Sequence, residues 1–451
     1  MRFHFIAIGG AVMHNLAITL HRGGHIISGS DDEIFEPSRS HLASEGLLPD
    51  KAGWFPERIT RDIDTIILGM HARADNPELQ RALELGLRIM SFPEFIYDRT
   101  RSKKRIVIAG SHGKTTTTAM IMHVFKTLGI KFDFMIGSSI TGYDTMVGLS
   151  DDAAFAILEG DEYLTSAIDK RPKFHLYMPD IAVINGIAWD HMNVFPTFEE
   201  YIQQFRIFAG KISDGGILVY FSGDPETLKI AENVKGNIKK VPYGIHGYFR
   251  NKTGFYAATH NRTVPLKIFG EHNMQNLSAA KEACIAAGIT EDNFYMAIQS
   301  FEGTSRRLQK LRENENGIAY IDFAHSPSKV RATVDAVAER YPDKNLIACL
   351  ELHTYSSLSK EFLPLYRGTM KNASYAFVYF NPHQLEAKKL PLLSKDSIKE
   401  AFGSENLAVF DNSAEMFSFI KLCHFVSPVY LFMSSGDYDG QDLQSLSEEL
   451  F

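Results

Sequence analysis

The sequence predicts a mixed α/β protein built from three domains. Short apolar segments alternate with helical patterns along most of the chain, and turns containing glycine or an acid follow several of those segments. A length of 451 residues sets a prior of about three domains. We place the domains at residues 1–103, 104–311 and 312–451, with the first boundary in the polar, basic stretch Arg99–Lys104.

Composition narrows the class of protein. Apolar residues make up 45% and charged residues 22% of the chain, as in ordinary globular proteins. The net charge of −7 gives no general attraction for nucleic acid or an anionic membrane. Polar residues and glycines interrupt the apolar start of the chain, and no apolar run approaches the ~18 residues of a membrane span. We therefore expect a protein that binds neither nucleic acid nor membrane. The three cysteines, Cys284, Cys349 and Cys423, are scattered without disulfide spacing, which suits a reducing compartment, and we expect the protein to be cytoplasmic.

The central domain should begin with a phosphate-binding loop. Ile106-Val107-Ile108 has the unbroken apolar character of a buried parallel strand, and an apolar repeat at helical spacing runs from Ile121 to Leu128. A glycine turn between them points backbone N–H groups and the positive end of the helix dipole at a phosphate. Lys114 would reach the outer phosphates, and the Thr115 hydroxyl would bind Mg²⁺. The strict motif is incomplete, because Ile108 stands where it has a glycine, and an ordinary glycine turn is the alternative. We nevertheless predict a nucleoside triphosphate site, formed by Gly110, Ser111, His112, Gly113, Lys114, Thr115 and Thr116.

The N-terminal domain begins as a βαβ unit of Rossmann-like type. A strand over Phe3–Ile8 leads through a glycine turn into a helix over Met13–Leu20, and a second strand starting at Ile26-Ile27 ends at Ser30-Asp31. An acid after the second strand is typical of a nucleotide-binding half-fold. The glycine fingerprint is poor, because Ala7, Ala11 and Val12 occupy positions where glycine is expected. A plain packing unit is therefore an equal alternative to a ligand site. Further strands are predicted at Thr65–Leu68 and Arg88–Ser91.

Polar residues follow two further strands of the central domain. Ala154–Leu158 runs into Glu159, and Ile181–Ile184 is followed a few residues later by His191. The carboxyl ends of neighbouring parallel strands face the crevice in which ligands bind. A carboxylate there is a common second anchor for nucleotide-bound Mg²⁺. The alternatives are a solvated loop acid for Glu159 and a core or helix-start histidine for His191.

The remainder of the chain adds three candidate features and a third α/β unit. Asn273 and Asn276 lie three apart at a helix start and could cap the helix or bind a base, and Arg306-Arg307 could be a solvated pair or bind a γ-phosphate. Residues 236–254 read as an irregular or β-rich insert. The last third predicts a doubly wound, Rossmann-like domain with strands at Ala319–Phe323, Leu346–Leu350, Tyr375–Phe380, Leu407–Phe410 and Val429–Met433 and a helix at Val330–Arg340.

Taken together, these motifs resemble the Mur ligase family. The matching segments cover the whole chain in the family's order: AGSHGKTTT, EGDEY, NGIAWDH, GEHNMQN, GTSRRL and DFAHSP. The resemblance implies three α/β domains and an ATP-dependent enzyme that forms amide bonds in cell-wall precursor synthesis. It also implies that closure of the domains assembles the site.

The resemblance further implies a role for each matching residue. Lys114 and Thr115 would hold the β- and γ-phosphates and Mg²⁺, and Glu159 and His191 would bind the metal ion. Arg307 would contact the γ-phosphate. The nucleoside of ATP would be contacted by Asn276 at the adenine and by Asp322 at the ribose, with His325 beside it. The UDP moiety of the other substrate would be contacted by Gly9, Gly10, Ser30 and Asp31. The position of a carbamylated lysine found in several members falls on Phe205 here.

Three patterns resemble those members of the family that attach a tripeptide. They are GSDDEIFEPSRS (Gly29–Ser40), DEYLTSAIDKRPKF (Asp161–Phe174) and MSSGDYDG (Met433–Gly440). The segment Glu351–Tyr355 also departs from the Pro-His-Arg-Tyr pattern of the members that add L-alanine. The resemblance thus implies a recycling enzyme, monomeric or homodimeric, that joins L-alanyl-γ-D-glutamyl-meso-diaminopimelate to UDP-N-acetylmuramate through an acyl phosphate. The alternative acceptor is L-alanine.

Two other classes of protein remain possible on the sequence. A P-loop switch or transport ATPase would hydrolyse ATP without an acceptor amine, and the third α/β domain argues against it. A non-catalytic UDP-sugar sensor would have no need of Lys114, Thr115, Glu159 and His191, all of which are present.

Overall fold

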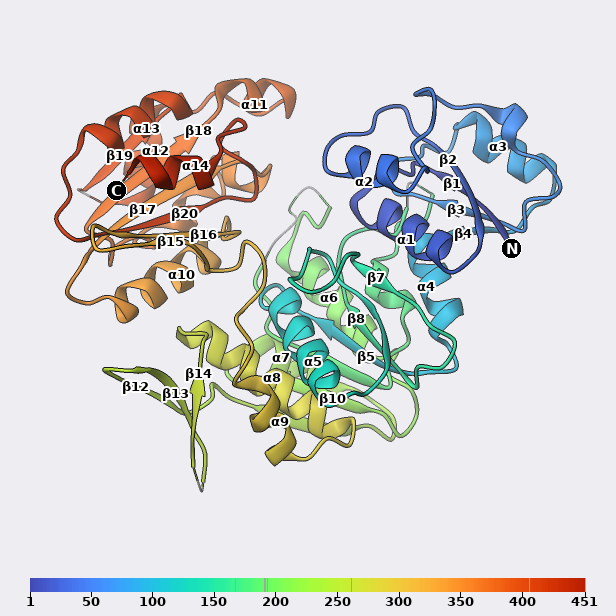
Figure 1. Ribbon diagram of the computed structural model, residues 1–451, viewed down its shortest axis with the longest axis horizontal. Coiled ribbons are helices and arrows are strands. Elements are labelled where there is room, and N and C mark those ends of the chain that lie inside the picture. The colour runs from blue at the N-terminus through green and yellow to red at the C-terminus, as the bar shows by residue number, and fades with distance from the viewer. Residues whose placement is uncertain (167, 190–191, 193, 261, 405, 451) are drawn as a thin grey trace. The chain divides into compact units, whose positions relative to one another are not determined.

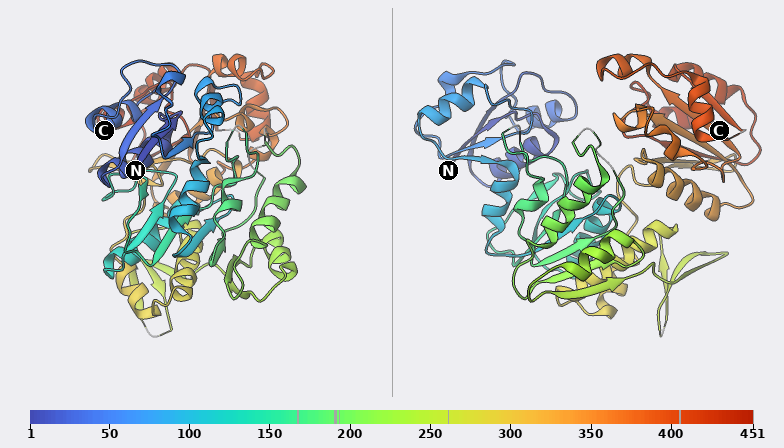
Figure 2. Two further views of the ribbon diagram at one scale, coloured as in Figure 1. Left: turned by 90° about the vertical axis from the view of Figure 1, so that its right-hand side faces the viewer. Right: turned by 180° about the vertical axis from the view of Figure 1, so that it is seen from behind.

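The computed structural model describes residues 1–166, 168–189, 192, 194–260, 262–404 and 406–450 (Figure 1). These residues cluster into two compact units. The first contains Met1–Ile187, Ile202–Gly244 and Ala279–Ile298, and the second contains Ala188–Tyr201, Ile245–Ser278 and Gln299–Phe451. Within the described residues the strands form four sheets, which Figure 2 shows from two further sides.

The N-terminal sheet is parallel and has the order β2-β1-β3-β4. Side-chain caps mark the start of α3 and α4, because Asn76 accepts from two backbone N–H groups at the start of α3 and Ser91 forms a capping box with Glu94 in α4. The bounds are β1 Arg2–Ile6, α1 Ala11–Arg22, β2 Ile26–Ser30, α2 Ser38–Ser44, β3 Thr65–Leu68, α3 Pro77–Glu84, β4 Ile89–Ser91 and α4 Phe92–Thr100.

The central sheet has seven strands in the order β11-β10-β9-β5-β8-β6-β7, all parallel except β7. Its middle strands are buried along almost their whole length, which explains their uninterrupted apolar sequences. The bounds are β5 Lys104–Ala109, α5 Lys114–Thr127, β6 Phe132–Met135, β7 Val147–Gly148, β8 Phe155–Glu159, β9 Ile181–Ile184, α6 Phe198–Ala209, β10 Ile217–Phe221, α7 Pro225–Asn233, β11 Lys239–Tyr243, α8 Glu271–Ala286 and α9 Glu291–Ile298.

The C-terminal sheet has the order β15-β16-β20-β17-β18-β19, with only β15 antiparallel. Alternate residues of its strands enter two different hydrophobic clusters, so both faces are covered. Along β17, for example, Ala348 and Leu350 belong to one cluster and Ile347 and Cys349 to the other. The bounds are β15 Gln309–Glu313, β16 Ile318–Asp322, α10 Pro327–Arg340, β17 Asn345–Leu352, β18 Tyr375–Phe380, α11 Pro382–Ala387, α12 Lys395–Phe402, β19 Leu407–Phe410, α13 Ser413–Leu422, β20 Pro428–Met433 and α14 Leu443–Glu449.

Each strand that the sequence analysis placed is present, and the structure adds others. The predicted insert divides in two, because Lys239–Tyr243 joins the central sheet as β11 and the following residues form an antiparallel sheet of β12 Tyr248–Asn251, β13 Gly254–Ala258 and β14 Thr263–Leu266. The second predicted boundary, after residue 311, falls inside β15. Since β15 pairs with β16, this strand belongs to the C-terminal sheet. None of the helices formed by the described residues has the length and apolar character needed to cross a membrane.

Candidate active site

The phosphate-loop segment connects β5 to α5 in a conformation that requires glycine. Gly110 and Gly113 have φ values of +131° and +72°, which disfavour other residues. A Cβ on Gly110 would also lie 2.9 Å from the backbone nitrogen of Asn185 at the end of β9. The Ser111 N–H donates to the Gly186 carbonyl at 2.9 Å, which ties the loop to that strand end. The predicted strand, turn and helix are therefore all present.

Lys114 is mostly buried and is held by three oxygen atoms. Its Nζ donates to the Gly110 carbonyl at 2.6 Å and to the two carboxylate oxygens of Glu162 at 3.0 and 2.7 Å. Burial acts to lower the pKa of Lys114, but the neighbouring carboxylates, Glu162 foremost, outweigh it and raise the pKa. The lysine thus carries its charge at the loop. Glu162 was not among the predicted site residues, although it lies in the EGDEY segment.

Two of the three predicted metal ligands lie together at the end of β8. The Thr115 hydroxyl donates to Glu159 Oε1 at 2.9 Å, and the Gly137 N–H donates to Glu159 Oε2 at 2.8 Å. A hydroxyl and a carboxylate that is 7% exposed form an oxygen donor set, which fits Mg²⁺. The third predicted ligand, His191, lies outside the described residues.

A cavity of about 380 Å³ joins the first loop of the chain to the end of β8. The residues that line it include Gly10, Ala11, Met13, Glu159, Asp161 and Lys173. Lys173 Nζ lies 2.5 Å from Asp161 Oδ2. The exposed Arg171 instead pairs with Asp169 and lines a different cavity. Lys173 therefore lies where it can contact an anion in the first cavity.

The first loop has glycine-like geometry although its sequence is poor in glycine. Ala7 has a φ of +67°, a left-handed conformation that glycine adopts without strain. Asp31 fixes the next part of the loop by accepting the Gly9 N–H at 2.7 Å, and the Ser30 carbonyl accepts from Ala7 at 2.9 Å. Burial raises the pKa of Asp31 to about 6. The four predicted UDP residues therefore form one loop system, of which Gly10 lines the cavity.

A second group of predicted residues gathers around the end of β16. The Arg307 guanidinium lies 4.6 Å from the centre of the Phe323 ring. Asp322 accepts the backbone N–H groups of Leu308 at 2.5 Å and Ala324 at 2.7 Å, which explains how this buried carboxylate is accommodated. Burial raises the pKa of Asp322, and the Arg307 charge opposes that shift. His325 Nδ1 lies 2.8 Å from the Phe323 carbonyl oxygen.

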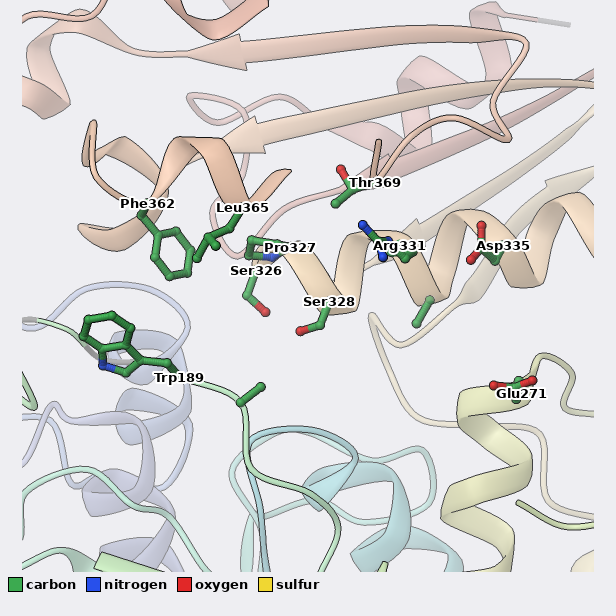
Figure 3. Close-up of a pocket in the computed structure, with 12 residues that line it drawn as sticks. Trp189, Glu271, Ser326, Pro327, Ser328, Arg331, Asp335, Phe362, Leu365 and Thr369 are labelled. Atoms are coloured by element: carbon green, nitrogen blue, oxygen red, sulfur yellow. The ribbon is translucent and has the colours of Figure 1, made fainter. Parts of the chain in front are cut away.

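A cavity of about 480 Å³ lies at the start of α10, directly after His325 (Figure 3). Figure 3 shows Trp189 and Phe362 on one side of it and Glu271 and Asp335 on the other. Ser326 is buried at the helix start, and its hydroxyl has no hydrogen-bond partner within the described residues. Asn276 lies on α8, where it is buried and its amide lies 3.5 Å from the Asn273 side-chain oxygen.

A polar cluster at the carboxyl edge of the C-terminal sheet had no assigned role in the sequence analysis. Glu351 near the end of β17 accepts from the Tyr438 N–H at 2.9 Å and from the Ser434 hydroxyl in the loop after β20. His353 Nδ1 lies 3.4 Å from Glu351 Oε1. The sequence does show polar residues directly after the apolar strands β17 and β20. Their contact could not be predicted, because it depends on β17 and β20 being neighbours in the sheet.

The position of the carbamylated lysine is filled by an apolar side chain. Phe205 is fully buried on α6 and packs edge-to-face on Phe174, with ring centres 5.4 Å apart. Phe174 in turn stacks on Phe208 at 4.8 Å. An aromatic cluster thus occupies this part of the central domain.

Comparison with known proteins agrees with this architecture. Residues 2–104 match the Mur ligase family catalytic domain, and residues 108–284 match the Mur ligase middle domain. A UDP-N-acetylmuramate–L-alanine ligase from Limosilactobacillus reuteri is 30% identical over 459 residues, covering 97% of this chain and 96% of that protein.

Solved structures of two kinds share the fold. The murein peptide ligase of Psychrobacter arcticus superposes with a TM-score of 0.69 at 22% identity, covering 100% of this chain and 98% of that chain. The UDP-N-acetylmuramate–alanine ligase of Thermotoga maritima gives 0.73 at 20% identity, with the same coverage of 100% and 98%. The chain belongs to the Mur ligase family of ATP-dependent, C–N bond-forming ligases of peptidoglycan synthesis.

Proposed function

We propose that this ligase joins L-alanyl-γ-D-glutamyl-meso-diaminopimelate to the lactyl carboxylate of UDP-N-acetylmuramate in peptidoglycan recycling. The observation that carries the proposal is the contact of Glu351 with Ser434 and Tyr438. Two segments that set the chain apart from the L-alanine-adding pattern, Glu351–Tyr355 and Met433–Gly440, thereby form one cluster. The cluster lies at the carboxyl edge of the C-terminal sheet, where α/β proteins bind ligands.

The second candidate is addition of L-alanine to the same acceptor carboxylate. It is favoured by the name of the Limosilactobacillus relative, which is 30% identical across almost the whole chain. The two candidates share their chemistry and differ only in the amine. Both use ATP and a UDP-sugar, which are cytoplasmic metabolites, and we place the enzyme in the cytoplasm.

The mechanism that we propose has two steps. The γ-phosphoryl group of ATP passes to the lactyl carboxylate, because an acyl phosphate has a good leaving group and a carboxylate does not. The amine then attacks the carbonyl carbon, a C–N bond forms and phosphate departs. Lys114 and Arg307 would offset the repulsion between the anions that the first step brings together.

We propose the following division of the binding residues. Gly110–Thr116 holds the phosphates of ATP, while Asn276, Asp322 and His325 receive its nucleoside end. Thr115, Glu159 and His191 hold Mg²⁺, which neutralises phosphate charge when bound. Gly9, Gly10, Ser30 and Asp31 hold the UDP moiety, and the cavity that Lys173 shares with Gly10 receives the muramyl part.

We also propose domain boundaries on the basis of strand pairing. The first domain ends at residue 103, immediately before β5. The boundary between the second and third domains lies before Gln309, where β15 starts, rather than after residue 311.

The test is phosphate release that depends on ATP, Mg²⁺ and UDP-N-acetylmuramate, with the tripeptide and L-alanine compared as acceptors. Release with the tripeptide and not with L-alanine is the expected result. Release with L-alanine alone would move the enzyme to de novo synthesis. Release that needs no amine at all would contradict the ligase mechanism.

A further inference from the structure

The end of β17 carries a carboxylate and an imidazole arranged as a pair. Glu351 is 2% exposed, whereas the His353 side chain is 34% exposed, so the pair has a buried end and an accessible end. Nδ1 of His353 faces Glu351 Oε1 at 3.4 Å, and Nε2 makes no hydrogen bond within the described part of the chain. A carboxylate on one ring nitrogen favours the tautomer that leaves the other nitrogen free to accept a proton.

The loop after β20 fits closely around this pair. A Cβ on Gly436 would lie 2.7 Å from His353 Nδ1 and 2.9 Å from Glu351 Oε2, so only glycine allows the loop to pack flat against both side chains. Ser434 and the Tyr438 N–H satisfy the other oxygen of Glu351. Burial acts to raise the pKa of Glu351, but hydrogen bonds from His353, Ser434 and Tyr438 outweigh it and lower the pKa. The carboxylate is therefore charged where it meets the imidazole.

The charged groups around the pair are compatible with a proton acceptor. Arg306 donates to the Gly436 carbonyl, so its charge is engaged there. Lys388, beyond α11, interacts with Glu351, and burial lowers the pKa of this lysine. The Tyr379 hydroxyl donates to Asp439, which removes that acid from the pair. Glu351 is thus the carboxylate that faces the imidazole.

We propose that His353, oriented by Glu351, accepts the proton of the acceptor's ammonium group. This inference rests on the proposed function, in which an amine attacks an acyl phosphate. An ammonium group has no lone pair, so it must lose a proton before it can act as a nucleophile. The proton moves from the ammonium nitrogen to His353 Nε2, the freed lone pair forms the C–N bond, and the bond from carbon to the phosphate oxygen breaks. The phosphate leaves with that electron pair, and the amide nitrogen loses its second proton to phosphate or solvent.

The alternative is that Glu351 only holds the loop of residues 434–440 in place. In that case His353 would pack against the loop without touching the substrate. The two roles differ in their dependence on pH. A base is needed only while the amine is protonated, and an α-amino group is largely deprotonated above about pH 8. A packing defect would be equally severe at all pH values.

The experiment compares His353→Gln with the wild type in two assays. Amide formation with the peptide should fall by about 10-fold at pH 7 and by about 100-fold at pH 6, because about a tenth and a hundredth of the α-amino groups are then already unprotonated. The deficit should shrink steadily as the pH rises past about 8, because solvent then deprotonates the amine. Trapping of the acyl phosphate by hydroxylamine, which is unprotonated near neutral pH, should stay within about twofold of the wild type, since it needs no base.

Further variants separate the remaining possibilities. Glu351→Gln should show a smaller deficit with the same pH dependence, because the imidazole remains. His383→Gln, which changes an exposed histidine on α11 of the same domain, is the matched control and should be unaffected. Equal amide formation by His353→Gln and wild type, or a deficit that does not vary with pH, would overturn the proposal. A parallel loss of hydroxamate would do so too, whereas absence of hydroxamate in the wild type would contradict the proposed ligase function instead.

Discussion

The contact between Lys114 and Glu162 makes a quantitative prediction about nucleotide affinity. The lysine that the phosphates require donates to both oxygens of a carboxylate that is only 1% exposed. A nucleotide must therefore compete with Glu162 for this charge. We expect Glu162→Gln, which keeps the shape and removes the charge, to bind ADP and ATP more tightly than the wild type.

The size of the effect follows from the interaction that is lost. A hydrogen bond between charged partners contributes about 1.5–3 kcal/mol. Since a factor of ten in affinity corresponds to about 1.4 kcal/mol, the Kd should fall by about 10- to 100-fold. The variant should also lose stability by a similar amount, because a neutral amide replaces the charged partner of Lys114.

Isothermal titration with ADP and Mg²⁺ would measure the change in Kd, and thermal unfolding without nucleotide would measure the change in stability. Asp169→Asn is a suitable control, because it removes a carboxylate from an exposed pair with Arg171 and leaves Lys114 untouched. Unchanged or weaker ADP binding by Glu162→Gln would show that the carboxylate does not hold the lysine back, and would refute the reasoning.

Three further predictions concern other charged groups. Lys114→Ala should abolish phosphoryl transfer while binding of the UDP substrate persists, and retained phosphate release in a coupled assay would contradict the assignment. Asp133→Ala should lower the free energy of unfolding by ~3–5 kcal/mol in a denaturant titration, because the buried Lys103 Nζ, which lies 2.5 Å from that carboxylate, loses its charged partner. The pKa of Asp31 is raised to about 6, so the folded protein binds this proton more tightly than the unfolded chain does. Protonated Asp31 therefore stabilises the folded state, and that contribution is lost as the pH rises through 6. The free energy of unfolding of the wild type should therefore fall, relative to that of Asp31→Asn, between about pH 4 and pH 6. Urea unfolding at several pH values measures it, and an equal pH dependence of the two proteins would contradict the prediction.

Much of the fold could be predicted because buried parallel strands are continuous apolar runs. Ile181–Ile184 and Val429–Met433 show no polar interruption, so length and flanking turns identify them as strands. The strands that were missed lie mostly at sheet edges. β15 has the sequence QKLRE and β11 contains two lysines and a proline, since an edge strand has one side open to water and tolerates such residues.

The site could be predicted where a local motif carries the chemistry. Gly110, Lys114 and Thr115 were found because a phosphate loop is contiguous in sequence. The partners of these residues depend on sheet order, which the sequence does not state. Glu351 and Ser434 are 83 residues apart and meet only because β17 and β20 are adjacent, and the same holds for Lys114 and Glu162 across β5 and β8.

The charges of the segment Glu159–Glu162 also support the Mg²⁺ that we propose for this site. Its three carboxylates each occupy a donor that the substrates would claim: Glu159 takes the Thr115 hydroxyl, Asp161 takes Lys173, and Glu162 takes Lys114. Three carboxylates and two lysines give these groups a formal charge of −1. A buried charge without a partner costs several kcal/mol, so we expect an incoming triphosphate to bring a cation that satisfies the acids as it takes the lysine. Substrate binding is then an exchange of ionic partners, and the oxygen donors of Thr115 and Glu159 suit Mg²⁺ in that exchange.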